Sequence, residues 1–310
     1  MKLERFAGNP VLTPSSNWWE EYLVFNAGAA TYNGKTHLLY RAQGRDKISR
    51  FGLAVSSDGY KFERFADPVV EGDENNKFER LGIEDPRITQ VGETYYIFYT
   101  AASVYPLTEA KNVNFAPSLS SKVPWRVRVS LMTTEDFRQF QKLGIVIPDL
   151  DTKDLALFPE QLKGKWYLCH RVYPNMYLST SDDLKTWKDS KIFATTRPGN
   201  WDSERIGVGA PPMKTEKGWL LFYHGADDTH VYRLGIMLLD INDPAKILYR
   251  SSEPILEPEA PYEKEGYVKN VVFTCGAVDK DGQYLVYYGA ADKVIGVATI
   301  DKTELLESLP

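Results

Sequence analysis

A glycine followed within a few residues by an apolar run recurs five times along this chain. The copies are GKTHLLYRA (34–42), GETYYIFYTA (92–101), GKWYLCHRV (164–172), GWLLFYHGA (218–226) and GQYLVYYGAAD (282–292). Most copies are followed by a second run, such as MYLSTSDDLKTW, in which apolar and polar residues alternate before an acidic turn. Alternation of this kind predicts half-buried β-strands. Helical patterns are nearly absent, and only the tail DKTELLESL (301–309) predicts a turn or two of helix.

The repeat predicts an all-β fold, a five-bladed β-propeller. A strand-rich unit of roughly 55–70 residues cannot bury its apolar face alone, whereas radial packing buries that face and protects most sheet edges. A pair of β-sandwiches is the alternative that the pattern leaves open. No stretch has the composition of a linker, so we expect one domain over residues 1–310.

Composition and charge limit the location and the partners. The net charge is −5 and there is no basic run, so we expect no nucleic-acid partner. No apolar stretch approaches the roughly 18 residues of a membrane span, and MKLERFAGNPVL lacks the apolar segment of a signal peptide. Cys169 and Cys275 lie in apolar runs, which predicts buried free thiols. These features predict a cytoplasmic protein without a membrane partner.

Polar side chains follow several of the apolar repeats. They are Arg41, His170 with Arg171, His224 and Asp292. In a propeller, residues at one register of successive blades converge on the central axis. Such side chains are costly to bury without partners, so their recurrence predicts a polar site at the axis. The alternative is that each is an ordinary strand-end residue in solvent.

The string GIEDPRI (82–88) places two carboxylates side by side just before the second repeat. Pro86 fixes its own φ and favours an extended conformation at Asp85. Cleavage of a glycosidic bond requires an acid that protonates the leaving oxygen, and a carboxyl group in this position suits that task. Glu84 would raise the pKa of Asp85 and Arg87 would lower it. A turn with a surface Asp–Arg pair is the alternative.

A third group of residues is suited to an anion. Arg128, Lys153 and His224 are cationic or can become so, and Tyr232 adds a hydroxyl. Charge-assisted hydrogen bonds from such groups are the strong means of holding a phosphate dianion. Nucleotide P-loop, GxSxG and HExxH patterns are absent, and the four histidines lack the spacing of metal ligands. We therefore expect neither a metal nor an organic cofactor.

These motifs together resemble glycoside hydrolase family 130, the β-mannoside phosphorylases and related β-mannosidases. The resemblance runs almost from end to end of the chain. It is carried by NPVL (9–12), FNAG (25–28), YRA (40–42), SSDG (56–59), GIEDPRI (82–88), KDLALFPE (153–160), HR (170–171), IGVGAPP (206–212), GWLLFYHG (218–225), RSSEPILEPE (250–259), VVFTCGAV (271–278) and YYGAAD (287–292).

The resemblance implies a five-bladed propeller that splits a terminal β-mannosidic bond with phosphate to give α-mannose 1-phosphate by inversion. Asp85 falls where the family has its general acid. The residues that fall where the family holds mannose are Asn26, Arg41, His170, Phe273 and Asp292. Those that fall where the phosphorylases hold phosphate are Arg128, Lys153, His224 and Tyr232, with Arg126 a close rival of Arg128. Inorganic phosphate is then the co-substrate, and β-mannosides or manno-oligosaccharides are the partners.

Two alternatives differ in chemistry. A β-mannosidase on the same scaffold would activate water with a carboxylate such as Glu204, and a non-catalytic carbohydrate-binding propeller would need no acid. The cations favour phosphorolysis. The sequence leaves the linkage, the acceptor sugar and the oligomeric state open, including a homo-oligomer. The segment 101–125 is rich in Pro, Ser and Asn, which predicts a long loop on the acceptor side or at a subunit contact.

Overall fold

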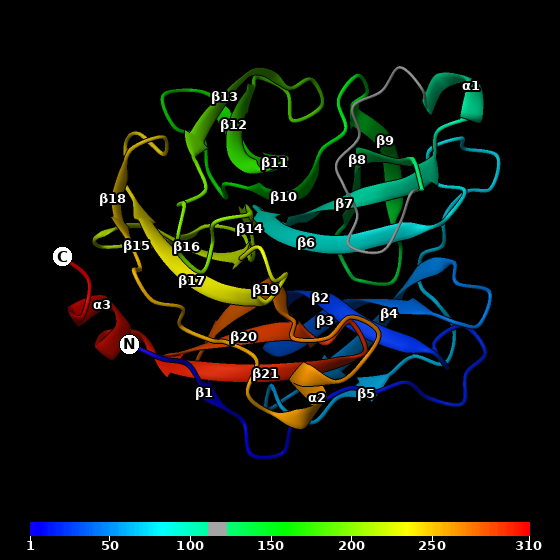
Figure 1. The fold of residues 1–310 in the computed structure, drawn as a ribbon, viewed down its shortest axis with the longest axis horizontal. Coiled ribbons are helices and arrows are strands. Elements are labelled where there is room, and N and C mark those ends of the chain that lie inside the picture. The colour runs from blue at the N-terminus through cyan, green and yellow to red at the C-terminus, as the bar shows by residue number, and fades with distance from the viewer. Residues whose placement is uncertain (111–122) are drawn as a thin grey trace.

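A computed structural model describes residues 1–110 and 123–310, and most of the regular structure in these ranges is β-strand. Figure 1 shows the strands as separate antiparallel sheets arranged around a common centre. The first strands of the sheets contact one another, so they form the inner wall of the ring. This arrangement is a five-bladed β-propeller, as the repeat predicts, and not a pair of sandwiches.

Each sheet is a continuous stretch of chain, except that the last also takes in the N-terminal strand. The first contains β2 (Leu23–Tyr32), β3 (Lys35–Gln43), β4 (Ser49–Ser56) and β5 (Glu63–Arg64). The second contains β6 (Ile83–Val91), β7 (Thr94–Val104), β8 (Trp125–Thr134) and β9 (Gln141–Ile147). The third contains β10 (Lys153–Leu157), β11 (Trp166–Val172), β12 (Asn175–Ser181) and β13 (Lys188–Ala194).

The fourth contains β14 (Arg205–Val208), β15 (Met213–Thr215), β16 (Gly218–Ala226), β17 (Tyr232–Leu239) and β18 (Ile247–Arg250). The fifth contains β19 (Val272–Lys280), β20 (Gln283–Ala290), β21 (Val294–Asp301) and β1 (Glu4–Arg5). The short helices are α1 (Leu107–Ala110), α2 (Pro261–Lys264) and α3 (Lys302–Glu307), and α3 confirms the predicted helical tail.

The five glycine-led repeats are the second strands of the five sheets, β3, β7, β11, β16 and β20. The alternating runs that follow them are the third strands. Gly34 and Gly282 have φ values of +72° and +81° in the tight turns that lead into β3 and β20, a conformation that glycine adopts without steric cost. The repeat therefore marks a hairpin turn and the strand after it.

The apolar core lies between neighbouring sheets. One cluster joins Tyr40 of the first sheet to Val297 of the fifth, and another joins Phe222 of the fourth to Val286 of the fifth. Because both faces of most strands are covered by other sheets, the strands are near-continuous apolar runs, and in β2 all residues but the last two are buried. This packing leaves the inner edges of the sheets at the axis for polar side chains.

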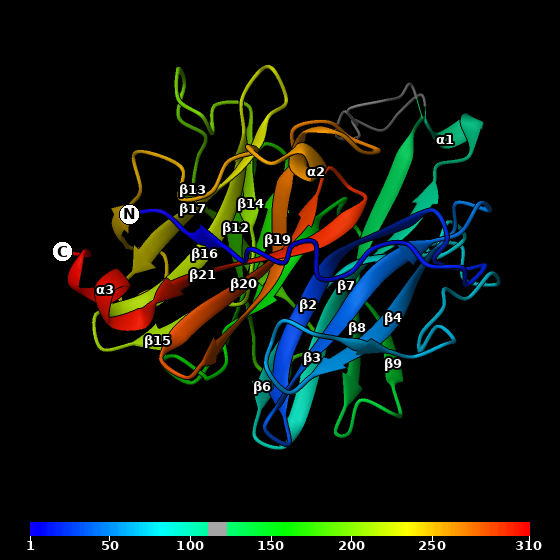
Figure 2. The same ribbon diagram turned by 90° about the horizontal axis from the view of Figure 1, so that it is seen from below.

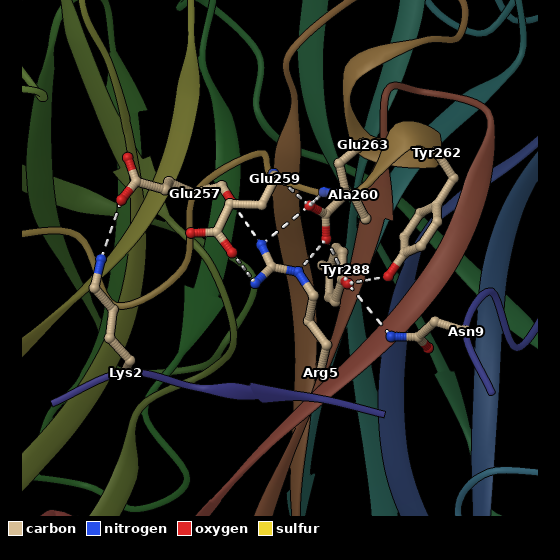
Figure 3. A network of polar contacts seen from close by, with 9 residues as sticks. All are labelled: Lys2, Arg5, Asn9, Glu257, Glu259, Ala260, Tyr262, Glu263 and Tyr288. Atoms are coloured by element: carbon tan, nitrogen blue, oxygen red, sulfur yellow. Dashed lines mark hydrogen bonds and ion pairs between the residues drawn. The ribbon is translucent and has the colours of Figure 1, made fainter. Parts of the chain in front are cut away.

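The N-terminal strand closes the ring, because β1 pairs antiparallel with β21. Figure 3 shows the Arg5 side chain donating from Nε and Nη2 to the two carboxylate oxygens of Glu263 in α2, at 2.8 and 3.0 Å. The buried Glu263 carboxylate also accepts a hydrogen bond from the Tyr288 hydroxyl and two from backbone N–H groups. The network ties the N-terminus to the segment that precedes β19.

The predicted loop 101–125 is partly regular. Residues 101–104 continue β7 and pair with residues 125–128 of β8, so the loop prediction is wrong at this end. Residues 107–110 form α1, and residues 111–122 lie outside the described residues. Cys169 and Cys275 are both buried and free, as predicted. Among residues 1–110 and 123–310, no helix has both the length and the apolar character that crossing a membrane requires.

Candidate active site

Polar side chains reach the propeller axis through β-bulges in the first strands of three sheets. The pairing register shifts around Asn26 in β2, Asp85 in β6 and Asp154 in β10. These residues have φ values of 46°, 53° and 55°, a left-handed conformation that Asn and Asp tolerate best after glycine. The extended conformation expected of Asp85 before Pro86 is therefore wrong, because the bulge sets the backbone at this residue. A bulge redirects the side chain that it carries and is common beside active sites. Three successive blades therefore present one polar residue each at equivalent positions.

Asp85 is held at this level by neighbours from the first sheet. Its Oδ1 accepts hydrogen bonds from Asn26 Nδ2 at 2.9 Å and from Arg41 Nη1 at 3.1 Å, and the residue is 4% exposed. Arg41 also donates from Nη2 to Glu84 Oε1 at 2.6 Å and from Nε to Ser49 Oγ at 2.9 Å. Figure 2 shows α2 at the upper end of the strands. One guanidinium thus orients both carboxylates of the EDPR string.

The carboxyl groups around Arg41 differ in pKa. Burial opposes ionisation of Asp85, but Arg41, Lys153 and the Asn26 hydrogen bond outweigh it and hold its pKa below the usual value. Burial raises the pKa of Glu84. Burial also raises the pKa of Asp292 to about 6, and the charge of Asp85 adds to this effect. In the free protein near neutral pH, Asp85 is therefore a carboxylate, whereas Asp292 is close to its titration point.

Arg87 connects Asp85 to a second buried carboxylate, Asp154. Its Nη1 donates to the Asp85 backbone carbonyl at 3.2 Å, and its Nη2 lies 3.5 Å from Asp154 Oδ1. Asp154 Oδ2 lies 3.1 Å from Arg171 Nη1 and 3.2 Å from His224 Nε2. Burial opposes ionisation of Asp154, but Arg171 and His224 hold its pKa well below the usual range. Burial lowers the pKa of His224 to about 4 despite this partner.

The remaining members of the cluster adjoin these two carboxylates. The Phe273 ring centroid lies 4.2 Å from that of His224, and the Tyr232 centroid lies 6.1 Å from it. Burial raises the pKa of Tyr232, so its hydroxyl remains a neutral donor. The charge of Lys153 acts on Asp85 and Asp292 and lowers both of their pKa values. Eight of the ten residues assigned from the sequence therefore lie in one connected cluster: Asn26, Arg41, Asp85, Lys153, His224, Tyr232, Phe273 and Asp292.

His170 does not join this cluster. Neighbouring residues of a strand point to opposite faces of the sheet, so His170 points away from the side on which Arg171 meets Asp154. Its Nδ1 is 2.8 Å from the Thr152 hydroxyl, and its Nε2 is 2.9 Å from Ser179 Oγ and 3.0 Å from Ser190 Oγ. The side chain is fully buried, and burial lowers its pKa to about 4.

Arg128 is likewise engaged elsewhere. It donates from Nε to the Pro148 carbonyl at 2.6 Å and from Nη1 to Asp151 Oδ1 at 2.5 Å. Its Nη2 donates to the Tyr105 hydroxyl at 3.0 Å. Its rival Arg126 donates to Ser103 Oγ at 3.0 Å. Both arginines, at the start of β8, therefore bond to neighbouring residues and not to members of the cluster around Asp85.

The sequence analysis missed Asp154 and placed no weight on Arg171 as a separate residue. A signal for Asp154 was present, because Asn26, Asp85 and Asp154 each come seven to ten residues before a repeat glycine. Across the two described ranges, no group of three or more His, Cys, Asp or Glu is placed to hold a metal ion. A cavity of about 540 Å³ lined by Tyr32, Lys35 and Phe137 lies at the opposite end of β2 from Asn26.

This arrangement suits two ligands at once. Carboxylate, amide and aromatic groups around Asp85 can hold a polyhydroxylated ring, and the cations around Asp154 can hold an anion. A carboxyl group beside both can move a proton between them.

Comparison with known proteins agrees with the motifs. A family model described as β-1,4-mannooligosaccharide phosphorylase matches residues 6–310. A 1,2-β-oligomannan phosphorylase from Thermoanaerobacter sp. (strain X514) is 42% identical over 313 residues, which cover 98% of this chain and 99% of the relative.

Solved structures show the same likeness. The β-1,2-mannobiose phosphorylase from Listeria innocua, in complex with β-1,2-mannobiose, has a TM-score of 0.85 and 29% identity, covering 100% of this chain and 99% of that one. A second solved structure is described by glycoside hydrolases of family 130 that target β-1,2 mannosidic linkages in Candida mannan. It has a TM-score of 0.85 and 27% identity, and the match covers 97% of this chain and 94% of that one. Because the family model and the relatives span nearly the whole chain, the protein belongs to glycoside hydrolase family 130 and is an enzyme of the phosphorylase type.

Proposed function

We propose that this enzyme cleaves the terminal β-1,2-mannosidic bond of manno-oligosaccharides with inorganic phosphate, releasing α-mannose 1-phosphate with inversion. One observation carries the proposal. The Asp85 carboxyl belongs to the same cluster as the cations Lys153 and Arg171 and the neutral imidazole of His224, through Arg87 and Asp154. Phosphorolysis needs an acid and an anion site on opposite sides of one sugar ring, whereas hydrolysis by water needs no anion site.

The proposed mannose contacts come from Asn26, Arg41, Asp292 and Phe273. Within the described part of the chain, Asn26 Oδ1 is buried without a hydrogen-bond partner. A buried acceptor left unpaired costs free energy, and a sugar hydroxyl would remove that cost. Arg41 is 13% exposed at its side chain, so the cluster is open to solvent at this point. Phe273 supplies an apolar ring face.

The proposed phosphate contacts come from Lys153, Arg171, His224 and Tyr232. Considering residues 1–110 and 123–310, Arg171 Nη1 and both ring nitrogens of His224 are buried without a hydrogen-bond partner. The Arg171 N–H group would give a phosphate dianion a charge-assisted bond. The His224 imidazole, which is neutral near pH 7, would donate one hydrogen bond through the ring nitrogen that carries its proton. His170 and Arg128 are left out of the proposed contacts because their polar atoms are already satisfied by neighbouring residues.

In the proposed step, a phosphate oxygen attacks C1 of the mannose from the face opposite the glycosidic oxygen. The new C1–O bond forms as the glycosidic bond breaks, and a proton from Asp85 passes to the leaving oxygen directly or through a mannose hydroxyl. The phosphate anion would offset the cations that keep Asp85 ionised, so its arrival would raise the pKa of the acid. The proton of monohydrogen phosphate then restores Asp85. The anion also stabilises an oxocarbenium-like transition state.

The β-1,2 linkage is supported by two likenesses. The relative that is 42% identical and the structure that is 29% identical are both described by activity on β-1,2-linked mannosides. The description of the matching family model names the β-1,4 linkage instead. Both linkages therefore belong in the test.

The decisive experiment incubates the enzyme with β-1,2- and β-1,4-mannobiose, each with and without phosphate, and follows the products by ³¹P and ¹H NMR. We expect α-mannose 1-phosphate only with phosphate and mainly from the β-1,2 substrate. Equal release of free mannose in both conditions would mean a hydrolase. Glu204, the carboxylate weighed for that role, is engaged by Arg205 and by the Tyr173 hydroxyl at 2.7 Å. The reverse reaction, with α-mannose 1-phosphate and a panel of acceptors, then identifies the acceptor and linkage.

A further inference from the structure

We propose that Asp154 is the positioning residue of the phosphate side of this site, holding Arg171 and His224 in place, and that Gly207 provides the space for it. The inference rests on the proposed function and deepens it. Asp154 lies on the third of the three equivalent bulges, where Asn26 and Asp85 occupy the other two.

Asp154 lies within contact distance of both of its partners on the phosphate side. Its Oδ2 is 3.1 Å from Arg171 Nη1 and 3.2 Å from His224 Nε2, distances that give strong electrostatic attraction. Yet all three atoms lack a partner of hydrogen-bond geometry among the residues that the structure describes. The carboxylate therefore holds the Arg171 guanidinium and the neutral His224 imidazole in place, while Arg171 Nη1 remains free to bond to an anion.

Charge also requires a group such as Asp154 here. Arg87, Arg171 and His224 all come within 3.5 Å of it, and Asp154 itself is fully buried. The guanidinium groups of Arg87 and Arg171 carry like charges that repel one another and lose their hydration on burial. A single carboxylate among them permits the cluster to exist before phosphate binds.

The fourth sheet leaves room for this pair by having no side chain where the other first strands have one. Gly207 of β14 is the register partner of His224. A Cβ at position 207 would lie 2.4 Å from Asp154 Oδ2 and 2.5 Å from His224 Nε2. These contacts are far shorter than van der Waals distances, so a methyl group would push the two side chains apart. This accounts for the first glycine of the IGVGAPP motif.

A matched control is available in the same molecule. Asp202 is fully buried as well, and it contacts Arg197, Arg250 and the Tyr223 hydroxyl in the fourth sheet. None of these is a member of the proposed site. Substitution there tests the cost of losing a buried carboxylate with two arginine partners away from the proposed site.

The experiment compares Asp154→Asn, Gly207→Ala and Asp202→Asn with the unmodified enzyme. Phosphorolysis of β-1,2-mannobiose gives KM for phosphate and for mannobiose, calorimetry gives the affinity for inorganic phosphate, and thermal unfolding gives Tm. We expect Asp154→Asn and Gly207→Ala to raise the phosphate KM about 10-fold or more while the mannobiose KM changes less than about threefold. Asp202→Asn should lower Tm and leave both KM values unchanged.

Either of two results would overturn the inference. One is a phosphate KM within about twofold of the unmodified enzyme in the folded variants, and the other is a rise of both KM values together in proportion to lost stability. If Asp154→Asn does not fold, Gly207→Ala still tests the inference, because it retains the Asp154 charge and displaces only the Asp154 and His224 side chains. Release of mannose by the unmodified enzyme without phosphate would contradict the proposed function instead. That result comes from the unmodified enzyme, so it is distinct from any result obtained with the variants.

Discussion

At the scale of single residues, the site is a set of buried charges that are stable only together. Asp85, Arg87 and Asp154 are at most 4% exposed, and each has an opposite charge within 3.5 Å. Removing one partner of a buried pair leaves the other uncompensated, at a cost of about 3–5 kcal/mol. Substitutions that keep the shape and remove the charge are therefore the most informative.

Asp85→Asn removes the proposed acid and keeps its hydrogen-bond acceptor for Asn26. We expect kcat on β-1,2-mannobiose to fall by about 10²–10⁴, the usual contribution of general acid catalysis. A mannoside with a good leaving group, such as dinitrophenyl, needs little protonation and should retain much of its rate. The ratio of the two rates is the measurement. A variant that still cleaved mannobiose at close to the original rate would remove Asp85 from the role.

Asp292→Asn should stabilise the protein above pH 6. Burial raises the pKa of Asp292 from 3.8 to about 6, so the folded state holds the proton more tightly than the unfolded chain. Stability therefore falls as pH rises from about 4 through 6, by on the order of 1–3 kcal/mol. The variant lacks this loss, so its Tm should exceed the original at pH 7.5 and match it near pH 4, while its activity falls. An unchanged or lower Tm at pH 7.5 would contradict the argument.

At the scale of elements, the first strands of the sheets position the site, and the N-terminal strand β1 closes the ring. The bulges in β2, β6 and β10 direct polar residues to the axis, and β1 completes the fifth sheet from the other end of the chain. The segment after α2 connects the closure to the site, because Val271 accepts from Ala291 N–H and donates to the Glu263 carbonyl. Closure and site therefore share backbone contacts.

Arg5→Gln should lower the free energy of unfolding by about 3–5 kcal/mol, because it leaves the fully buried Glu263 without its cation. Lys2→Gln is the matched control, since Lys2 pairs with Glu257 at side-chain exposures of 55% and 37%. An exposed pair of that kind contributes about 0–1 kcal/mol. Urea unfolding of both variants gives the comparison (Figure 3). Equal losses in the two would mean that the Arg5 network does not stabilise the closure.

At the scale of the whole molecule, the ring fully buries two histidines, His170 and His224, in the neutral state, and this makes the fold sensitive to acid. Burial lowers the pKa of His170 and of His224 from 6.5 to about 4. Below pH 6.5 these two histidines bind protons in the unfolded chain but remain unprotonated in the folded protein. Each histidine therefore contributes stability that is complete above pH 6.5 and is lost as pH falls toward 4, on the order of 1–3 kcal/mol.

His170→Gln separates this effect from catalysis. Glutamine can still bond to the Thr152 and Ser179 hydroxyls but does not titrate. We expect unfolding free energies measured from pH 7 to 4.5 to fall less steeply than in the original protein. The KM for mannobiose should stay within about twofold, because His170 lies outside the cluster. A large rise in that KM would place His170 at the sugar after all.

Much of the fold and of the site was readable from the chain. The five repeats predicted the number of blades, because each glycine-led hairpin is local and its period of two is written in adjacent residues. Asp292 was singled out at the end of the fifth repeat and Asp85 in the GIEDPRI string, and the family resemblance then implied a role for each. Which neighbour governs the pKa of Asp85 was not readable, since Arg41 and Lys153 come from other sheets and their distance depends on packing.

What the sequence by itself determined is the architecture and most of the polar residues at its axis, since strand alternation and turn glycines act over a few residues. Only the tertiary structure decided which face each strand turns to the centre. One residue of register moved Arg171 into the cluster and His170 out of it. It also placed Asp154 beside His224 over the bare Gly207, a contact between sheets that no local pattern specifies.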